Sequence, residues 1–482
     1  MRNANLITSD ELIEGLLQRV GPEVVVTDLE IIKPFLYEER GLYQGHPQLL
    51  VLPRSTEEVA SIIEFCAKVN VPVVPQGGNT GLVGGAVAGE GEVLLSLRRM
   101  SHILSVDIAN STMIVEGGVV LEEIQEAAKK EGYLFPLKLG AQGSCQIGGN
   151  IATNAGGINV LHYGNARELV LGLEVVLPDG RIWNGLRSLH KDNTGYSLKN
   201  LFIGSEGTLG VITKAVLKLF PQPRDKITAL CALDSVEDAL SLLIKMKSRA
   251  EYGLTAFELM SSFSFSLACS HYNKSNPIEN NYEWFVLLEI SGLESTEAMQ
   301  GRIEELLMEA YDDELIKDVV ITKNLRQAGD LWNLRESIPE AQKRLGGSIK
   351  HDVSIPVYRI AEFLEVAEKA ISQVLPEAKF CTFGHLGDGS IHYNLVQPSN
   401  MTESCFFKHT EKVNTIVHDI VDQFEGSFSA EHGIGLMKRE ELNRRKDPVE
   451  LDLMYKLKAA IDPLGIMNPG KMLTRRHSPL DR

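Results

Sequence analysis

Two kinds of hydrophobic pattern alternate over the first 220 residues. Apolar residues recur at helical spacing after two capping boxes, Thr8-Ser9-Asp10-Glu11 and Ser55-Thr56-Glu57-Glu58, which satisfy free N–H groups where a helix begins. Short apolar runs at 49–52 and 71–74 are typical of buried strands. The chain therefore predicts a short N-terminal helix, followed by a strand, a helix and a strand.

The pattern changes after Pro221-Gln222-Pro223-Arg224, where glycine becomes rarer and helical and strand patterns alternate. We expect an α+β layer, with an antiparallel sheet that helices cover on one face. Strands are expected at 227–232, 284–291, 317–322, 350–355 and 378–383, and helices at 236–249, 295–311, 325–343, 358–374 and 403–424.

Size and composition narrow the class of protein. A chain of 482 residues predicts two or three domains, and 44% hydrophobic with 23% charged residues is ordinary for a soluble globular protein. The net charge of −16 and the lack of a basic run argue against nucleic acid. The six cysteines are scattered without a Cys-x-x-Cys pair, and no apolar run is long enough to cross a bilayer. We expect a cytoplasmic protein with no transmembrane segment.

Glycine-rich loops are the first candidate chemistry. Pro75–Gly85 holds five glycines between two apolar strands, and a second glycine-rich region runs from Gly140 to Gly164. Backbone N–H groups in such loops can bind phosphate, although a merely mobile loop is the alternative. Two such loops suit a pyrophosphate and a flavin ring. Neither contains Gly-x-Gly-x-x-Gly, which argues against a nicotinamide cofactor in a Rossmann unit.

The stretch 383–394 is the second candidate. Asp388-Gly389 favours a two-residue type I′ turn, which places His385 directly opposite His392, with Asn394 further along the same face. Opposed Cβ atoms lie about 4.5–5.5 Å apart, close enough for two imidazoles to bind one metal ion. With Glu431 as third ligand, the set is typical of a catalytic divalent-metal site. The alternative is a solvated hairpin with two polar side chains.

These loops, the hairpin and Glu431-His432-Gly433 resemble the vanillyl-alcohol-oxidase-like flavoproteins, with their p-cresol-methylhydroxylase-type FAD domain. Within that family the chain is most similar to the D-2-hydroxy acid dehydrogenases, from about Leu50 to Leu473. The resemblance implies an α+β fold: a two-subdomain FAD-binding domain, a cap domain with an antiparallel sheet, and a C-terminal segment that returns to the flavin. The expected boundaries are 1–45 for an N-terminal helical segment, 46–223 for the FAD domain, 224–430 for the cap with the metal hairpin, and 431–482 for the C-terminal segment.

The resemblance also implies roles for single residues. The metal ligands fall on His385, His392 and Glu431, and a substrate-carboxylate arginine falls on Arg335. Without the resemblance, Arg335 would be taken for a surface helix residue paired with a nearby glutamate. Lys350, Asn394 and His432 match further substrate-facing positions. The positions expected to bind FAD are Pro75, Gln76, Gly77, Gly78, Asn79, Thr80, Gly81, Gly143, Ser144, Gly148, Asn150, Thr153, Asn154, Gly156, Gly157, Tyr163, Gly164, Glu206, Gly207, Gly210, Ile212 and Asn468.

The implied reaction is oxidation of an R-2-hydroxy acid, D-2-hydroxyglutarate first, to the 2-oxo acid. FAD is expected to be noncovalent, because Asn79 stands where covalently flavinylated members often carry a histidine. A divalent ion, zinc by preference, would act as Lewis acid, with His432 as base; alternatively His432 only orients Glu431. Pro339 departs from the family's hydroxyl residue four positions after the arginine, which leaves D-lactate, D-malate or another acid open.

Partners and competing functions complete the expectations. The resemblance implies an electron acceptor, either an electron-transfer flavoprotein, a quinone or a cytochrome, and we expect a homodimer. Competing functions are a D-lactate dehydrogenase or glycolate oxidase FAD subunit, a metal-independent flavin oxidase, a metal-dependent hydrolase whose glycine loops bind phosphate, and a non-catalytic subunit that holds FAD as a scaffold.

Overall fold

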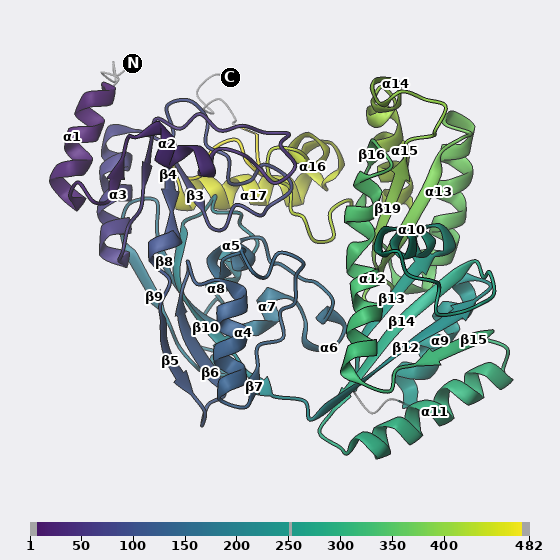
Figure 1. Cartoon of the computed structure of the whole chain (residues 1–482). Helices are drawn as coiled ribbons and strands as arrows, with labels where there is room; N and C mark the ends of the chain where they lie inside the picture. Colours follow the sequence, from purple (N-terminus) through teal and green to yellow (C-terminus); the bar gives the residue numbers. More distant parts are fainter. Residues whose placement is uncertain (1–6, 250–252, 475–482) are drawn as a thin grey trace. The chain divides into compact units, whose positions relative to one another are not determined.

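The computed structural model describes residues 7–249 and 253–474, which divide into two compact units (Figure 1). Unit 1 comprises the described residues up to 156, then 165–221 and 432–474; unit 2 comprises 157–164 and the described part of 222–431. The C-terminal segment from His432 onward thus belongs to the first unit, and Glu431, the predicted first residue of that segment, belongs to unit 2. Residues 1–6 of the expected N-terminal segment and 475–482 of the expected C-terminal segment lie outside the described residues.

Two sheets form the framework of unit 1. The first has the order β1-β2-β4-β3, in which β2 and β3 both run parallel to β4, and the second is antiparallel with the order β5-β6-β10-β8-β9. A short pair joins β11 to β7. The strands are β1 Val25–Val26, β2 Leu49–Val51, β3 Val73–Gln76, β4 Val93–Ser96, β5 Ile103–Asp107, β6 Thr112–Glu116, β7 Tyr133–Leu134, β8 Val170–Val176, β9 Ile182–Gly185, β10 Val211–Lys218 and β11 Phe220–Pro221.

Both expected caps begin helices of unit 1. Thr8 caps α1 with a reciprocal capping box to Glu11, and Ser55 caps α3, whose stripe of Val59, Ile62 and Ile63 is fully buried. The helices are α1 Ser9–Val20, α2 Leu29–Ile32, η1 Lys33–Phe35, α3 Thr56–Val69, η2 Leu97–Arg99, α4 Leu121–Lys130, α5 Ile147–Ala152, α7 Ala166–Leu169, α8 Lys199–Phe202, α16 Arg439–Arg445 and α17 Pro448–Ile461.

Unit 2 is built on one antiparallel sheet with the order β15-β12-β14-β13-β18-β19-β16, in which β17 also pairs with β19. The five expected strands are present within a few residues of their predicted ends, and the sequence pattern missed β13. The strands are β12 Asp225–Leu233, β13 Leu254–Ser261, β14 Trp284–Gly292, β15 Asp318–Ile321, β16 Ser348–Ile349, β17 Asp352–Ser354, β18 Lys379–His385 and β19 Ser390–Val396.

Helices cover both faces of this sheet, so the expectation of a single covered face was wrong. Alternate residues of β12 belong to different cores: Cys231 packs toward α9, α11, α13 and α15, whereas Leu230 packs toward α10 and α12. Strands buried on both faces are apolar without alternation, which is the pattern of 229–233. The helices are α6 Val160–Tyr163, α9 Val236–Arg249, α10 Ser262–Tyr272, α11 Thr296–Asp312, α12 Leu325–Lys343, η3 Val357–Arg359, α13 Ile360–Val374, α14 Glu403–Phe407 and α15 Thr410–Gln423.

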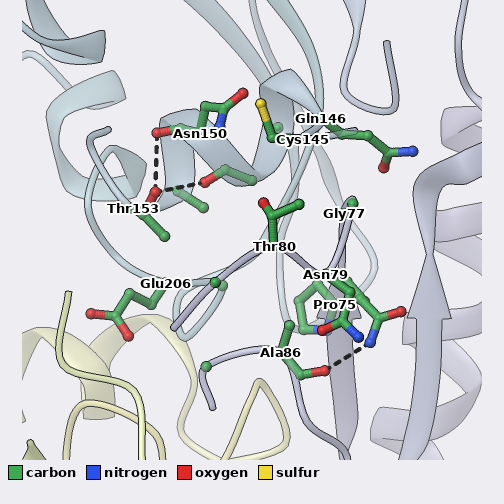
Figure 2. A pocket seen from close by; sticks show the side chains of 18 of the residues that line it. Pro75, Gly77, Asn79, Thr80, Ala86, Cys145, Gln146, Asn150, Thr153 and Glu206 are labelled. Carbon is green, nitrogen blue, oxygen red and sulfur yellow. Dashed lines mark hydrogen bonds between the residues drawn. The ribbon is translucent and has the colours of Figure 1, made fainter. Parts of the chain in front are cut away.

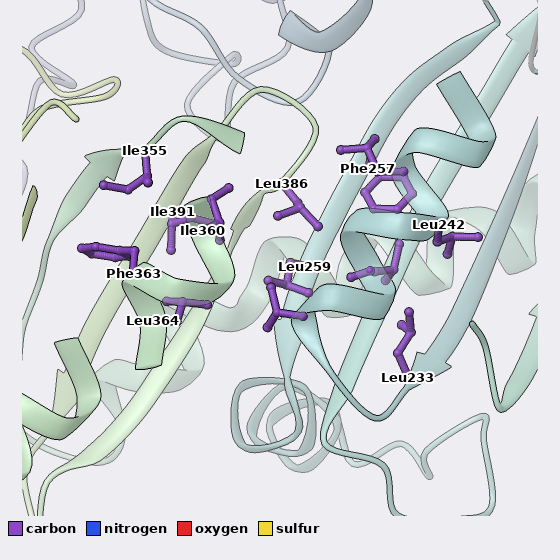
Figure 3. Close-up of a cluster of buried hydrophobic side chains, with 14 of the residues drawn as sticks. Leu233, Leu242, Phe257, Leu259, Ile355, Ile360, Phe363, Leu364, Leu386 and Ile391 are labelled. Atoms are coloured by element: carbon purple, nitrogen blue, oxygen red, sulfur yellow. The ribbon is translucent and has the colours of Figure 1, made fainter. Parts of the chain in front are cut away.

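The larger core fixes the orientation of the hairpin β18–β19. Leu386 and Ile391 point into that core together with Phe363 of α13 and Leu259 of β13, as Figure 3 shows. Successive strand residues point to opposite faces, so His392 points to the other face, where α12 packs. The sheet thus separates a face that packs on a hydrophobic core from the face on which His392 lies.

Candidate functional site

A pocket in unit 1 brings the two glycine-rich regions together. It contains about 930 Å³ of empty space, which includes open solvent at its mouth. The loop after β3, the start of α5 and Glu206 surround the same space in Figure 2. His432, from the C-terminal segment, also lines this pocket.

The pocket wall fits a bound flavin nucleotide in two respects. A Cβ at Gly81 or Gly149 would meet no described atom within 4 Å, so the backbone there faces open space that a ligand can fill closely. Three buried amide oxygens that line the pocket, on Gln76, Gln146 and Asn150, accept no hydrogen bond from the described residues. Buried acceptors need donors, and the N–H and O–H groups of FAD could supply them.

Most of the expected FAD positions line this pocket, and the others do not. Pro75 to Gly81 all do, as do Gly148, Asn150, Thr153, Glu206, Gly207, Gly210 and Ile212. Gly143, Ser144, Asn154, Gly156 and Asn468 are in unit 1 but outside the lining, whereas Gly157, Tyr163 and Gly164 belong to unit 2. The prediction missed Val83, Gly85, Ala86, Leu97, Cys145, Gln146, Gly149, Ala152 and Val211.

Glu206 holds the loop that carries His432. Its buried carboxylate accepts hydrogen bonds from the backbone N–H groups of Ile434 (2.8 Å) and Gly435 (2.7 Å). Burial raises the pKa of Glu206, and these two N–H groups act in the opposite direction. Asn468 donates to the backbone carbonyls of Glu206 (2.7 Å) and Gly85 (2.9 Å), so it links two backbone segments that line the pocket.

The hairpin in unit 2 is wider than its sequence predicted. His385 pairs with Ser390, and His392 pairs with Phe383, so the two histidines are diagonal neighbours and not directly opposed. Gly389 has a positive φ of 91°, but Asp388 does not, and a type I′ turn needs both. Asp388 instead accepts the N–H of Ser390, and the loop spans Leu386 to Gly389.

Both histidines nevertheless point to one side, because the register differs from the prediction by an even number of residues. Their ring centroids lie 6.0 Å apart. Glu431 completes the cluster: its Oε1 lies 3.6 Å from His385 Nε2 and its Oε2 lies 3.8 Å from His392 Nε2. One ligand atom from each of the three residues lies within 4.8 Å of the others.

This donor set fits a divalent ion. Ligand atoms at about 2.0–2.2 Å from one Zn²⁺, at tetrahedral angles, lie about 3.4 Å apart, which is close to the separations of the cluster. Two imidazoles and one carboxylate leave a coordination position for a substrate. Within the residues that the structure describes, this is the group of three metal-ligating side chains that meets these distances.

Glu258, which sequence reasoning missed, lies behind the cluster. Its Oε1 is 2.6 Å from His385 Nδ1, and its Oε2 is 2.8 Å from Arg335 Nε and 2.7 Å from Arg335 Nη2. Glu258 is on β13, directly across the sheet from His385, and is fully buried. The one available signal was an acidic residue inside the apolar run Leu254–Met260.

The ionisable side chains of the cluster shift one another's pKa. Burial alone would raise the pKa of Glu258, but His385 and Arg335 outweigh burial and lower that pKa to about 2. Burial alone would lower the pKa of His385, but the carboxylates of Glu258 and Glu431 raise it to about 9. Burial raises the pKa of Glu431. A divalent ion between the three side chains would favour the ionised carboxylate and the neutral imidazoles that metal ligation needs.

The expected substrate-facing residues of unit 2 lie on different elements. Arg335 is on α12, only 6% exposed, with its guanidinium 4.8 Å from the Phe383 ring centroid, so it is not a surface residue paired along its own helix. Asn394 donates to Gln342 (3.2 Å) and accepts the backbone N–H of His351 (3.2 Å). Lys350 is half-buried between β16 and β17. Their contacts with a substrate stay a prediction.

Comparison with known proteins identifies two family matches along the chain. The family described as "FAD binding domain" matches residues 47–185, and "FAD linked oxidases, C-terminal domain" matches residues 222–472. The D-2-hydroxyglutarate dehydrogenase of Bos taurus is 38% identical over 97% of this chain and 84% of its own, and that of Xanthomonas citri pv. viticola is 37% identical over 90% and 91%. A solved structure of p-cresol methylhydroxylase with substrate bound has a TM-score of 0.73 at 15% identity, covering 96% of each chain.

Two observations bear on the expected cytoplasmic location. Among residues 7–249 and 253–474, no helix combines the length and apolar character that crossing a bilayer requires. The bovine relative's name includes "mitochondrial" and the bacterial one does not, so the cytoplasmic location of this chain stays a prediction. The fold, the pocket lined by both glycine-rich regions and the extent of these matches lead to one assignment: the chain belongs to the family of FAD-linked oxidases that includes the D-2-hydroxyglutarate dehydrogenases.

Proposed function

We propose that the chain is an FAD- and divalent-metal-dependent dehydrogenase that oxidises an R-2-hydroxy acid to the 2-oxo acid, with D-2-hydroxyglutarate as substrate and Zn²⁺ as metal. The observation that carries the proposal is the cluster of His385, His392 and Glu431, whose ligand atoms lie within 4.8 Å of one another. The names of the bovine and Xanthomonas relatives support the substrate.

The chemistry needs two groups besides the protein. When bound, FAD would supply the acceptor for the hydride from C2 of the acid, and a divalent ion would supply Lewis-acid polarisation of the C2 hydroxyl. His385, His392 and Glu431 would hold that ion and leave a position open for the substrate. Loss of the hydride with its electron pair and of the hydroxyl proton leaves the 2-oxo acid, so the site must also take up one proton.

His432 is the proposed acceptor of that proton. It lines the pocket of unit 1 and directly follows the metal ligand Glu431 in the chain. Histidine is the commonest general base because its pKa is close to neutral pH. Glu206 keeps the backbone of the loop 432–435 in place through the N–H groups of Ile434 and Gly435.

Arg335 is the proposed partner of a substrate carboxylate. Glu258 occupies its Nε and Nη2 atoms on one side, and Nη1 lies outside that ion pair. A guanidinium carries five N–H donors, so it can bind a second carboxylate while it stays paired. Pro339, four residues later on the same helix, has no side-chain donor, which keeps D-lactate and D-malate as second candidates.

We also infer that the reduced flavin passes its electrons to an acceptor, which is an electron-transfer flavoprotein, a quinone or a cytochrome. We further infer that the protein is a homodimer. A non-catalytic scaffold would not need the metal cluster together with Arg335 and His432. A metal-independent oxidase would not need it either.

The purified protein is expected to be yellow and to contain one divalent ion per chain. Acid or heat should release FAD from the polypeptide, because Asn79, which donates to the Tyr37 carbonyl (2.7 Å), stands at the position where a histidine would form the covalent bond. Absorbance spectra of the supernatant after precipitation, with metal analysis of the same sample, measure both groups. Flavin that stays with the denatured chain would contradict the noncovalent assignment, and a yellow protein without metal would favour a metal-independent oxidase.

A further inference from the structure

We propose that Glu258 is a positioning residue that ties the metal centre to the substrate-carboxylate site: one carboxylate oxygen orients the ligand His385 and the other orients Arg335. This inference rests on the proposed function, because it assigns Glu258 a task toward the metal and the substrate of that reaction.

The first support is that the two carboxylate oxygens of Glu258 have different partners. Among the described residues, the polar partner of Oε1 is the imidazole, at 2.6 Å from His385 Nδ1, and that of Oε2 is the Arg335 guanidinium, at 2.8 Å and 2.7 Å. His385 comes from β18 and Arg335 from α12, so a single side chain on β13 fixes groups from two other elements. A displacement of either partner would therefore strain the contact to the other.

The second support is the orientation of His385. With Nδ1–H donated to Glu258, the lone pair of Nε2 remains on the side of Glu431, 3.6 Å away. This is the arrangement by which a carboxylate selects the tautomer of a metal-binding histidine and makes it a stronger ligand.

The third support is that only a carboxylate can serve both partners. His385 Nδ1–H and the Arg335 N–H groups are all donors, so both oxygens of residue 258 must be acceptors. Glutamine would present an NH₂ group to one of these donors. Aspartate would keep the charge but is one methylene shorter, so it could not reach both partners from the same strand position.

A second buried glutamate shows what a purely structural carboxylate looks like in this sheet, and it supplies a matched control. Glu289 on the neighbouring strand β14 binds Lys226 (2.9 Å) and the indole N–H of Trp332 (3.1 Å). Among the described residues, its hydrogen-bond partners, which also include the Thr255 hydroxyl (3.3 Å), are not ligands of the metal cluster. E289Q makes the same carboxylate-to-amide change at similar burial, without touching His385 or Arg335.

Zinc affinity of the FAD-loaded full chain tests the first half of the inference, by competition with a chromophoric chelator. E258Q is expected to bind Zn²⁺ about 10–100-fold more weakly than the wild type, and E289Q within about threefold of it. The flavin absorbance spectrum, measured on the same samples, should be unchanged in both. Equal zinc affinity of E258Q and the wild type would overturn the inference.

Two further variants distinguish the effect of Glu258 on metal binding from its effect on Arg335. They also keep the test valid if E258Q alone misfolds. R335M leaves Glu258 on His385, so its zinc affinity should match the wild type while its KM for D-2-hydroxyglutarate rises at least about tenfold. E258Q/R335M removes both charges, so no buried arginine is left without a partner. It should bind Zn²⁺ about 10–100-fold more weakly than R335M. If R335M and E258Q/R335M bind Zn²⁺ equally, Glu258 does not contribute to metal binding.

Failure of the proposed function gives a different result. In that case the wild type itself shows no saturable zinc site in the competition titration. The inference about Glu258 fails alone when the wild type binds Zn²⁺ and E258Q binds it equally well. E258Q that raises KM but leaves zinc affinity unchanged would likewise overturn the proposed link between the two sites.

Discussion

His385→Ala and His392→Ala are each expected to release the divalent ion and to lower kcat by at least about 10³-fold, because Lewis-acid stabilisation by a metal supplies several kcal/mol. Each change removes one of three ligands, and the two that remain cannot hold the ion at ordinary concentrations. His385 Nε2 lies 3.6 Å from Oε1 of Glu431 and His392 Nε2 lies 3.8 Å from Oε2, so each histidine supplies a separate ligand atom. Metal analysis and steady-state kinetics on the same samples measure the two effects.

The flavin should stay bound in both variants. The pocket that suits FAD is lined by residues of unit 1, whereas both histidines belong to unit 2. His409→Ala is the matched control, since His409 lies at the start of α15 in unit 2 and outside the cluster. It should change neither metal content nor kcat. Full activity of both hairpin variants, in a wild type that carries no metal, would show that the cluster is a structural hydrogen-bond network.

His432→Ala is expected to keep both the metal and the flavin and to lower kcat by about 10²–10⁴-fold, the usual contribution of a general base. His432 is not one of the three clustered ligands, so the ion should stay. Added imidazole should restore part of the rate, since a free base can enter the space that the side chain vacates. Metal analysis, flavin spectra and kinetics with and without imidazole measure these effects.

The alternative role of His432 predicts a different pattern. A histidine that only orients Glu431 would, on removal, weaken the metal, and added imidazole would not restore the rate. A variant with kcat within about threefold of the wild type would contradict both roles. In that case the loop 432–435, which Glu206 holds through two backbone hydrogen bonds, would contribute only to the wall of the pocket.

The sequence predicted the hairpin site partly for a wrong reason. The type I′ turn at Asp388-Gly389 does not form, and the pairing differs by two residues from the expected one. Because side chains alternate with a period of two, an even difference keeps His385 and His392 on one face. A difference of one residue would have buried His392 where Ile391 now packs in the core. The prediction of a shared face is thus safer than the prediction of the turn.

Other features could not be read from local patterns. Glu258 and His385 are 127 residues apart, and no spacing rule connects an acidic residue in one strand to a histidine in another. The burial of Arg335 depends on α12 covering the second face of the sheet, which the expectation of a single covered face excluded. The unbroken apolar run 229–233 did contain that information, because a strand with one solvated face alternates.

Anaerobic mixing of the purified protein with D-2-hydroxyglutarate tests the central claim most directly, with the flavin absorbance followed in a single turnover. The metal-loaded protein should lose its oxidised-flavin absorbance with the D isomer and keep it with the L isomer. After chelation the D isomer should cause no bleaching, and Zn²⁺, Mn²⁺ or Co²⁺ should restore it to different extents. Flavin reduction by D-2-hydroxyglutarate at an unchanged rate in metal-free protein would contradict the account, and so would reduction by the L isomer alone.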